Sequence, residues 1–229
     1  MSRCLQFDVG NSRAKWRLVE QEGVVDRNTL VHGDSRDLER LMTCADTVDQ
    51  IWIASVAGPQ VEQELSAVLR ERWGVEPWFA RSPAAFGGLV NSYSEPLRMG
   101  VDRWLAMLGA RLRCKQRLCV IDAGSALTID LMERALLLDT GRVRFEEDVG
   151  YSLSPGKSTA EAVRHGIALA QAGAVKLALD HAGGDVPTLY FCGGAGQSVQ
   201  QLLQAEGQYV PDLVFDGLVN MAVEQASGD

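Results

Sequence analysis

The chain has 229 residues, of which 46% are hydrophobic, and it carries a formal net charge of -8 at pH 7. A chain of this length can bury a sizeable core, either as one large domain or as two smaller ones. The acidic balance argues against nucleic acid and anionic membrane surfaces as partners, because both repel a protein of this charge.

The N-terminal residues contain no apolar run of signal-peptide length, and no window of the sequence is apolar enough for a membrane helix. We therefore expect a cytoplasmic protein that binds no membrane. The five cysteines are odd in number and form no Cys-x-x-Cys pair. This pattern favours reduced and mostly buried thiols over a disulfide framework or a zinc site.

Short apolar strand patterns alternate with helical periodicity along the chain, which is typical of an α/β fold. In chain order, the patterns predict strand 4–9, strand 50–56, helix 61–73, helix 99–112, strand 118–121, helix 159–181, strand 189–192 and helix 197–205.

Two of the predicted strands end in the same way. Residues 7–12 read FDVGNS and residues 121–126 read IDAGSA, so an acid and a glycine close an apolar strand each time. This internal echo predicts two halves that begin alike, at 1–116 and 117–229. The alternative is two coincidental strand exits, since Asp-x-Gly is a common turn.

The turn after the first strand carries groups suited to phosphate. Gly10 lets a phosphate approach backbone N–H groups without a Cβ in the way, and Asn11 and Ser12 add side-chain donors. Asp8 can hold a hydrated divalent cation, and Lys15 can supply a point charge to phosphate oxygens. Two such turns facing each other would clamp a nucleoside triphosphate.

Two further glycine-rich segments carry weaker signals. Gly193 and Gly194 follow an apolar strand and permit close approach of a nucleobase or ribose, although such loops are often mere turns. Residues 150–158 (GYSLSPGKS) resemble a phosphate-binding P-loop, but five residues instead of four separate the glycines. We interpret residues 155–159 as the start of a helix instead.

Asp102 is the best candidate for a general acid or base. Gly100 would give access to its carboxylate, and Arg103 would give it a charge partner. The alternative is an ordinary helix N-terminus, where an acid interacts favourably with the helix dipole. His32 and the two other histidines show no metal-ligand spacing and form no Ser/His/Asp pattern, which favours surface or supporting roles.

Taken in order, these segments resemble the type III pantothenate kinases, a family of the acetate kinase, sugar kinase and actin superfamily. The resemblance spans nearly the whole chain, with Ser12 and Ser125 where the family usually has Thr. It implies an α/β fold of two ribonuclease H-like (actin-like ATPase) halves, with mixed sheets and an interdomain cleft.

The resemblance also implies roles for the matching residues. Asp102 would be the catalytic base, Asp8 would hold magnesium through water, and Asp122 would ligate a monovalent cation, K+ or NH4+. The residues that would bind ATP and its phosphates are Asp8, Gly10, Asn11, Ser12, Lys15, Gly124, Ser125, Ala126, Thr128, Gly193 and Gly194. The residues that would bind pantothenate are Tyr93, Gly100, Val101, Asp102, Arg103 and Thr159.

The activity implied by the resemblance is ATP-dependent phosphorylation of pantothenate to 4′-phosphopantothenate, the first step of coenzyme A biosynthesis. A homodimer is implied as well, with no nucleic acid or membrane among its partners. Two alternatives stay open. One is a regulatory accessory protein, since relatives called Bvg accessory factors are associated with transcriptional effects, and the other is a kinase of another small alcohol.

One departure from the family pattern follows the second acid–glycine turn. The family has a return strand there that bears Gly-Gly-x-Ile-x-Pro-Gly, whereas here residues 128–131 run directly into a helix-like stretch at 132–136. Without a return strand the sheet would expose an unpaired edge. We therefore expect that roughly 15 to 20 residues are absent from this part of the chain, in the way that mobile loops often are.

Overall fold

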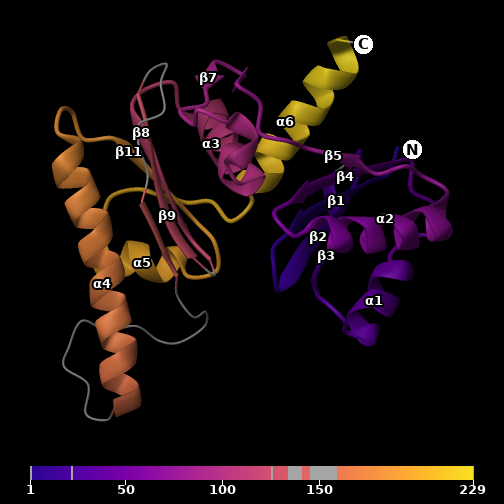
Figure 1. Cartoon of the computed structure of the whole chain (residues 1–229), viewed down its shortest axis with the longest axis horizontal. Helices are drawn as coiled ribbons and strands as arrows, with labels where there is room; N and C mark the ends of the chain where they lie inside the picture. Colours follow the sequence, from indigo (N-terminus) through magenta and orange to yellow (C-terminus); the bar gives the residue numbers. More distant parts are fainter. Residues whose placement is uncertain (1, 22, 125, 134–140, 145–158, 229) are drawn as a thin grey trace. The chain divides into compact units, whose positions relative to one another are not determined.

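The computed structural model describes residues 2–21, 23–124, 126–133, 141–144 and 159–228 (Figure 1). The contacts between residues divide the chain into two compact units, and both are discontinuous in sequence. The first unit comprises Met1–Ser82, Leu97–Leu105 and Val214–Asp229, and the second comprises Pro83–Pro96 and Ala106–Leu213.

The first unit is built on a five-stranded mixed sheet with the order β3-β2-β1-β4-β5. β1 pairs antiparallel with β2 and parallel with β4, so it lies at the centre of the sheet. β3 continues the antiparallel side and β5 the parallel side. The strands are β1 (Cys4–Val9), β2 (Arg13–Glu20), β3 (Gly23–Val31), β4 (Gln50–Ser55) and β5 (Trp78–Phe79).

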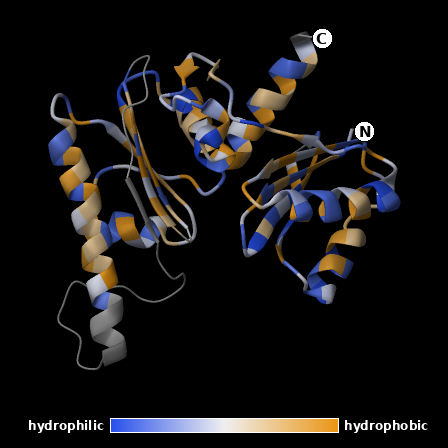
Figure 2. Cartoon of the chain, in the orientation of Figure 1, coloured by the Kyte–Doolittle hydropathy of each residue, from blue (hydrophilic) through white to orange (hydrophobic). Residues whose placement is uncertain are grey.

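Helices α1 (Ser35–Met42) and α2 (Pro59–Trp73) complete the core of the first unit. Side chains from both helices, Leu41, Leu65 and Leu69, join one buried cluster with strand residues such as Phe7 and Ile53. Figure 2 shows the hydrophobic residues concentrated on the strands, whereas the helices alternate hydrophobic and hydrophilic residues. This is the amphipathic pattern expected of helices that cover a sheet.

The second unit repeats the sheet of the first, with the order β10-β9-β8-β11-β12 and the same pattern of directions. Its core includes side chains from α4 and α5, and α4 runs alongside the strands (Figure 1). The elements are β8 (Leu118–Ala123), β9 (Ala126–Met132), β10 (Gly141–Arg144), α4 (Thr159–Ala182), β11 (Thr188–Cys192), α5 (Gly196–Leu203) and β12 (Gln208–Tyr209).

Shorter elements and two helices complete the chain. These are the hairpin of β6 (Ala85–Phe86) and β7 (Leu89–Val90), the 3₁₀ turn η1 (Pro96–Arg98), α3 (Val101–Arg113) and α6 (Leu213–Gly228). Most of α6 packs with the first unit, although it ends the chain. No helix in the described ranges is long and apolar enough to cross a membrane.

The two halves that the internal echo predicts correspond to two sheets of one topology. β1 and β8 even have the same burial pattern, in which only the acid before the last residue is partly exposed. All strands of the first sheet precede residue 116 and all strands of the second follow it. A domain boundary near this residue nevertheless stays a prediction.

The expectation that the return strand is absent is wrong. β10 pairs antiparallel with β9 over Gly141–Arg144, so the edge of β9 is covered. The printed sequence also carries Gly150, Leu153, Pro155 and Gly156 at the family's spacing, in the segment that resembled a P-loop. Residues 145–158 lie outside the described residues, but the reason for inferring missing residues no longer holds.

A close approach of two helices gives the first testable prediction. A Cβ added to Gly217 on α6 would lie 2.0 Å from the backbone oxygen of Leu105 on α3. Because that obstacle is backbone, Gly217→Ala should lower the free energy of unfolding by about 2 to 3 kcal/mol in urea titrations. The control is Gly173→Ala on α4, where a Cβ meets no atom within 4 Å. Equal stability of Gly217→Ala and wild type would contradict this packing.

Candidate functional site

The turn between β1 and β2 places several of the predicted residues together. Gly10 N donates to Arg13 O at 2.9 Å, which closes a tight turn. Asp8 on β1 lies directly opposite Lys15 on β2 in the antiparallel register. The side chains of Asn11, Ser12 and Lys15 are exposed. The turn therefore presents hydrogen-bond donors and a cation to solvent, with a carboxylate behind them.

The carboxylate of Asp8 is in an unfavourable place for a negative charge. Its pKa is raised from 3.8 to about 6, chiefly because burial disfavours the charge; Lys15 opposes the rise, and the neighbouring Asp102 adds to it. A partly buried acid beside a second acid is a recurrent feature of functional sites, because a bound cation can relieve both costs.

Asp102 lies in the first turn of α3, as the sequence predicts for a helix start. Its Oδ1 accepts a hydrogen bond from Arg103 N at 2.7 Å. The same oxygen lies 2.6 Å from the position that a Cβ on Gly100 would take. Gly100 therefore leaves the space in which this carboxylate sits. Asp102 lies near enough to Asp8 to raise the pKa of that carboxyl, so the two predicted acids are neighbours within the first unit.

The turn between β8 and β9 repeats this arrangement in the second unit. Gly124 N donates to Ala126 O at 3.1 Å, and Asp122 lies opposite Thr128 in the register. Oγ1 of Thr128 is buried and has no hydrogen-bond partner among the described residues. A buried hydroxyl of this kind is an available oxygen ligand or donor. Ser125 lies outside the described residues.

The Gly193–Gly194 loop packs directly on the second acid–glycine turn. Gly193 has a φ of +79°, and a Cβ there would lie 2.3 Å from Oδ1 of Asp122. Ala195 N donates to Ala123 O at 2.8 Å, which ties the loop to the end of β8. The glycine that looked like a weak signal in the sequence is therefore required by contact with a predicted site residue.

The other predicted substrate residues are divided between the units. Val101 is buried and Arg103 partly buried beside Asp102 in the first unit. Tyr93 belongs to the second unit, where its backbone N donates to Oδ1 of Asn91 at 3.0 Å. Thr159 begins α4, but its side chain lies outside the described residues.

The sequence analysis missed one residue at the first turn, His32. Its Nε2 lies 2.9 Å from the backbone oxygen of Gly10. No local sequence pattern points to His32. The residue follows β3, and the pairing of Val31 at the end of that strand with Arg13 brings it beside the turn. The five cysteines are free, as predicted.

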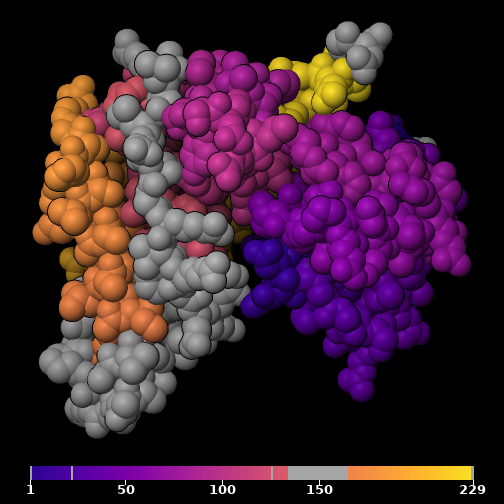
Figure 3. Space-filling model, in the orientation of Figure 1, coloured from indigo at the N-terminus to yellow at the C-terminus, as the bar shows by residue number. Residues whose placement is uncertain are grey.

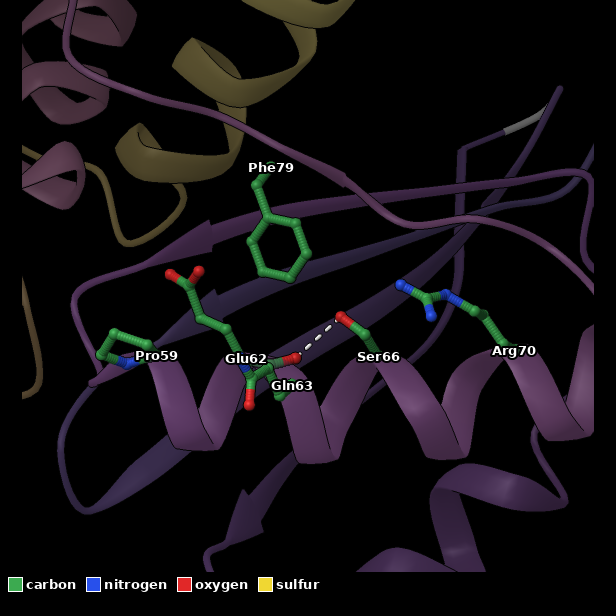
Figure 4. A pocket seen from close by; sticks show the side chains of 6 residues that line it. All are labelled: Pro59, Glu62, Gln63, Ser66, Arg70 and Phe79. Carbon is green, nitrogen blue, oxygen red and sulfur yellow. Dashed lines mark hydrogen bonds between the residues drawn. The ribbon is translucent and has the colours of Figure 1, made fainter.

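A shallow hollow of about 280 Å³ lies along α2 and contains none of the predicted site residues. Figure 4 shows its lining, in which Ser66 Oγ donates to the backbone oxygen of Glu62 at 2.7 Å. Its charged side chains are paired, since Glu62 contacts Arg81 at 2.7 Å and Arg70 contacts Glu76 at 2.8 Å. We therefore consider the acid–glycine turns, and not this hollow, the candidate functional site.

The comparisons with known proteins agree with the resemblance found in the sequence. A sequence model of the type III pantothenate kinase family matches residues 4–137. A type III pantothenate kinase of Marinobacter nauticus is 32% identical over 237 residues, which cover 95% of this chain and 97% of the relative.

Two solved structures share the fold. A Campylobacter jejuni protein named as a Baf family transcriptional activator gives a TM-score of 0.59 at 19% identity, with coverage of 97% of this chain and 99% of that chain. The activator of 2-hydroxyisocaproyl-CoA dehydratase from Clostridium difficile, with bound ADPNP, gives 0.56 at 12% identity, with coverage of 99% and 96%. The predicted actin-like ATPase fold is confirmed.

The raised pKa of Asp8 leads to a prediction about stability and pH. The folded chain holds the Asp8 proton more tightly than the unfolded chain, so this group costs stability as pH rises from 3.8 to about 6. Asp8→Asn should therefore be more stable than wild type above pH 6, by about 3 kcal/mol, and about equally stable below pH 4.

Urea unfolding of both proteins at about pH 4, 5, 6 and 7.5 measures this difference in stability. The control is Asp46→Asn at an exposed aspartate, which should show no pH-dependent gain. A stability difference for Asp8→Asn that is the same at every pH would contradict the assignment of a desolvated charge.

Proposed function

The chain belongs to the type III pantothenate kinase family, and from this premise we propose how it carries out the reaction. It transfers the γ-phosphoryl group of ATP to the primary hydroxyl of pantothenate, which yields 4′-phosphopantothenate in the first step of coenzyme A biosynthesis. The observation that carries the proposal is the electrostatic contact of Asp102 with Asp8, across from Lys15. The proposed base, cation ligand and phosphate ligand are thus three residues of one unit.

Asp102 is the catalytic base in this proposal. Its carboxylate accepts the proton of the substrate hydroxyl as that oxygen attacks the γ-phosphorus, and ADP leaves. Its position in the first turn of α3 stabilises the charged form, because the positive end of the helix dipole is there. Gly100, Val101, Arg103, Tyr93 and Thr159 are the proposed pantothenate ligands.

The two acid–glycine turns bind the ATP phosphates. In the first turn, Gly10, Asn11 and Ser12 provide hydrogen-bond donors and Lys15 a positive charge, which fits the exposure of the last three side chains. In the second turn, Gly124, Ser125, Ala126 and Thr128 have the corresponding role. Gly193 and Gly194 bind the adenosine part, which fits the contacts of Gly193 and Ala195 in the same loop with the end of β8.

The donor atoms at both turns suit the cations that the family implies. Asp8 is a desolvated carboxylate beside a second acid, which favours a hydrated magnesium ion. Asp122 and the unpartnered hydroxyl of Thr128 are hard oxygen donors for potassium or ammonium. Among the described residues, no group of three His, Cys, Asp or Glu side chains could hold a metal. ATP phosphates and water would therefore complete both shells, and the cations would neutralise phosphate charge.

A homodimer is part of the proposal, as is a cytoplasmic location. Leu169 and Leu177 are exposed on α4, with 58% and 65% of their surfaces accessible. This helix lies at the surface in Figure 3, where it is orange. Its exposed leucines are candidate contacts for a second copy, because such side chains are most often covered at interfaces.

The activity is tested by ADP release with ATP and pantothenate, with and without potassium. We expect turnover that depends on both substrates and rises with potassium. Asp102→Asn should lower kcat by about 10³-fold, because it removes the base but keeps the shape of the side chain. Asp46→Asn is the matched control and should not change kcat.

Three other outcomes would contradict parts of the proposal. Wild-type turnover by Asp102→Asn would contradict the assignment of Asp102 as the catalytic base. Turnover only with another alcohol would favour a kinase of a different substrate. No turnover with any alcohol would favour a regulatory accessory role.

The contact between Gly100 and Asp102 gives a second prediction for this site. Gly100→Ala places a Cβ 2.6 Å from Oδ1 of Asp102, which is closer than van der Waals contact allows, so the flexible carboxylate has to rotate away. We expect kcat to fall by about tenfold while the free energy of unfolding changes by less than about 1 kcal/mol. Gly58→Ala, at which no atom lies within 4 Å of the added Cβ, is the control. An unchanged kcat in Gly100→Ala would contradict the proposed place of the reactive carboxylate.

A further inference from the structure

His32 contacts both sides of the first acid–glycine turn. Its ring Nε2 lies 2.9 Å from the backbone oxygen of Gly10, and its backbone N donates to Ser12 O at 3.4 Å. The residue follows directly after β3, and it is half-buried. One residue therefore connects a neighbouring strand end to the beginning and the end of the turn.

The contact with Gly10 determines which nitrogen of the neutral ring carries the proton. A backbone carbonyl can only accept a hydrogen bond, so Nε2 has to carry the proton. In the neutral ring Nδ1 is then the unprotonated nitrogen. The imidazolium form donates from Nε2 in the same way, so the contact survives protonation of the ring.

The surroundings of His32 leave room for substitution. His32 borders a cavity of about 350 Å³ between α1, α2 and the strands, with apolar lining residues that include Leu30, Leu38 and Leu65. Close packing does not enclose the residue where it borders this cavity, so the bond to Gly10 does more to orient the ring. A side chain of similar size can replace the imidazole without overpacking.

We propose that His32 is a positioning residue for the ATP phosphates. The peptide bonds of the described residues, including the one between Gly10 and Asn11, are all trans, and in a trans peptide the C=O and N–H groups point in opposite directions. Holding the Gly10 carbonyl toward His32 therefore turns the N–H of Asn11 away from His32, where it is available to a phosphate oxygen. This inference rests on the proposed function of the Gly10–Ser12 turn.

The test compares two substitutions in the full chain with steady-state kinetics. His32→Phe keeps a ring but loses the donor, and we expect the KM for ATP to rise about 3- to 10-fold. The kcat and the KM for pantothenate should stay within about twofold, since the reacting groups are untouched. His32→Gln restores an amide donor and should bring the KM for ATP to within about twofold of wild type.

Lys15→Gln separates this inference from the proposed function. We expect it to raise the KM for ATP by about tenfold, because it removes a phosphate ligand. If Lys15→Gln has this effect but His32→Phe leaves the KM for ATP unchanged, the role of His32 is overturned and the phosphate turn stands. If neither substitution changes the KM for ATP, the turn does not bind phosphate, and both proposals are overturned.

A spectroscopic measurement tests the same contact without activity. In ¹⁵N-labelled protein, long-range ¹H–¹⁵N correlation spectra of the imidazole distinguish the two neutral tautomers. We expect the neutral ring of His32 to have its proton on Nε2. A proton on Nδ1 would overturn the inference, because the ring could not then donate to Gly10.

Discussion

The charge of Asp8 is the constraint on which the rest of this site depends. The carboxylate lies at the end of a central strand that is otherwise buried, and both burial and Asp102 disfavour its ionised form. Such a cost persists in a folded protein when a ligand relieves it. Lys15 relieves part of it across the β1–β2 register, and a hydrated cation with ATP phosphates would relieve the remainder. The proposed binding of a cation with ATP phosphates thus accounts for the two neighbouring acids, for Lys15 and for the glycine turn together.

The second sheet repeats the first and carries the second of the two proposed phosphate-binding turns. β8 repeats the burial pattern of β1, and Asp122 takes the place of Asp8 before a second glycine turn. The partners differ, however, because Thr128 replaces Lys15 opposite the acid and Gly193 packs against the carboxylate. The residue directly opposite the acid thus offers a hydroxyl in the second strand pair and an ammonium in the first. This difference fits a monovalent cation at the second turn and a phosphate ligand at the first.

Much of the fold could be predicted from the sequence, and the failures have physical reasons. The strand predicted at 4–9 has the observed bounds of β1, and the apolar runs of β4, β8 and β11 were found because central parallel strands are buried on both faces. β2 was missed although Ala14, Trp16 and Leu18 alternate with polar residues, and the burial of Arg17 between them was not foreseen either. Its partners are Gln6 at 2.8 Å and the ring of Phe215 at 4.5 Å, and no local pattern reveals them. His32 was missed for the same reason, since strand pairing places it.

The most direct test of the account follows backbone amides while the protein binds a nucleotide. In ¹H–¹⁵N spectra, a non-hydrolysable ATP analogue with magnesium should shift the amides of Asn11, Ser12, Gly124, Ala126 and Gly194, and leave those of Glu62 and Arg70 along α2 unchanged. Shifts that cluster along α2, with none at either acid–glycine turn, would contradict the account.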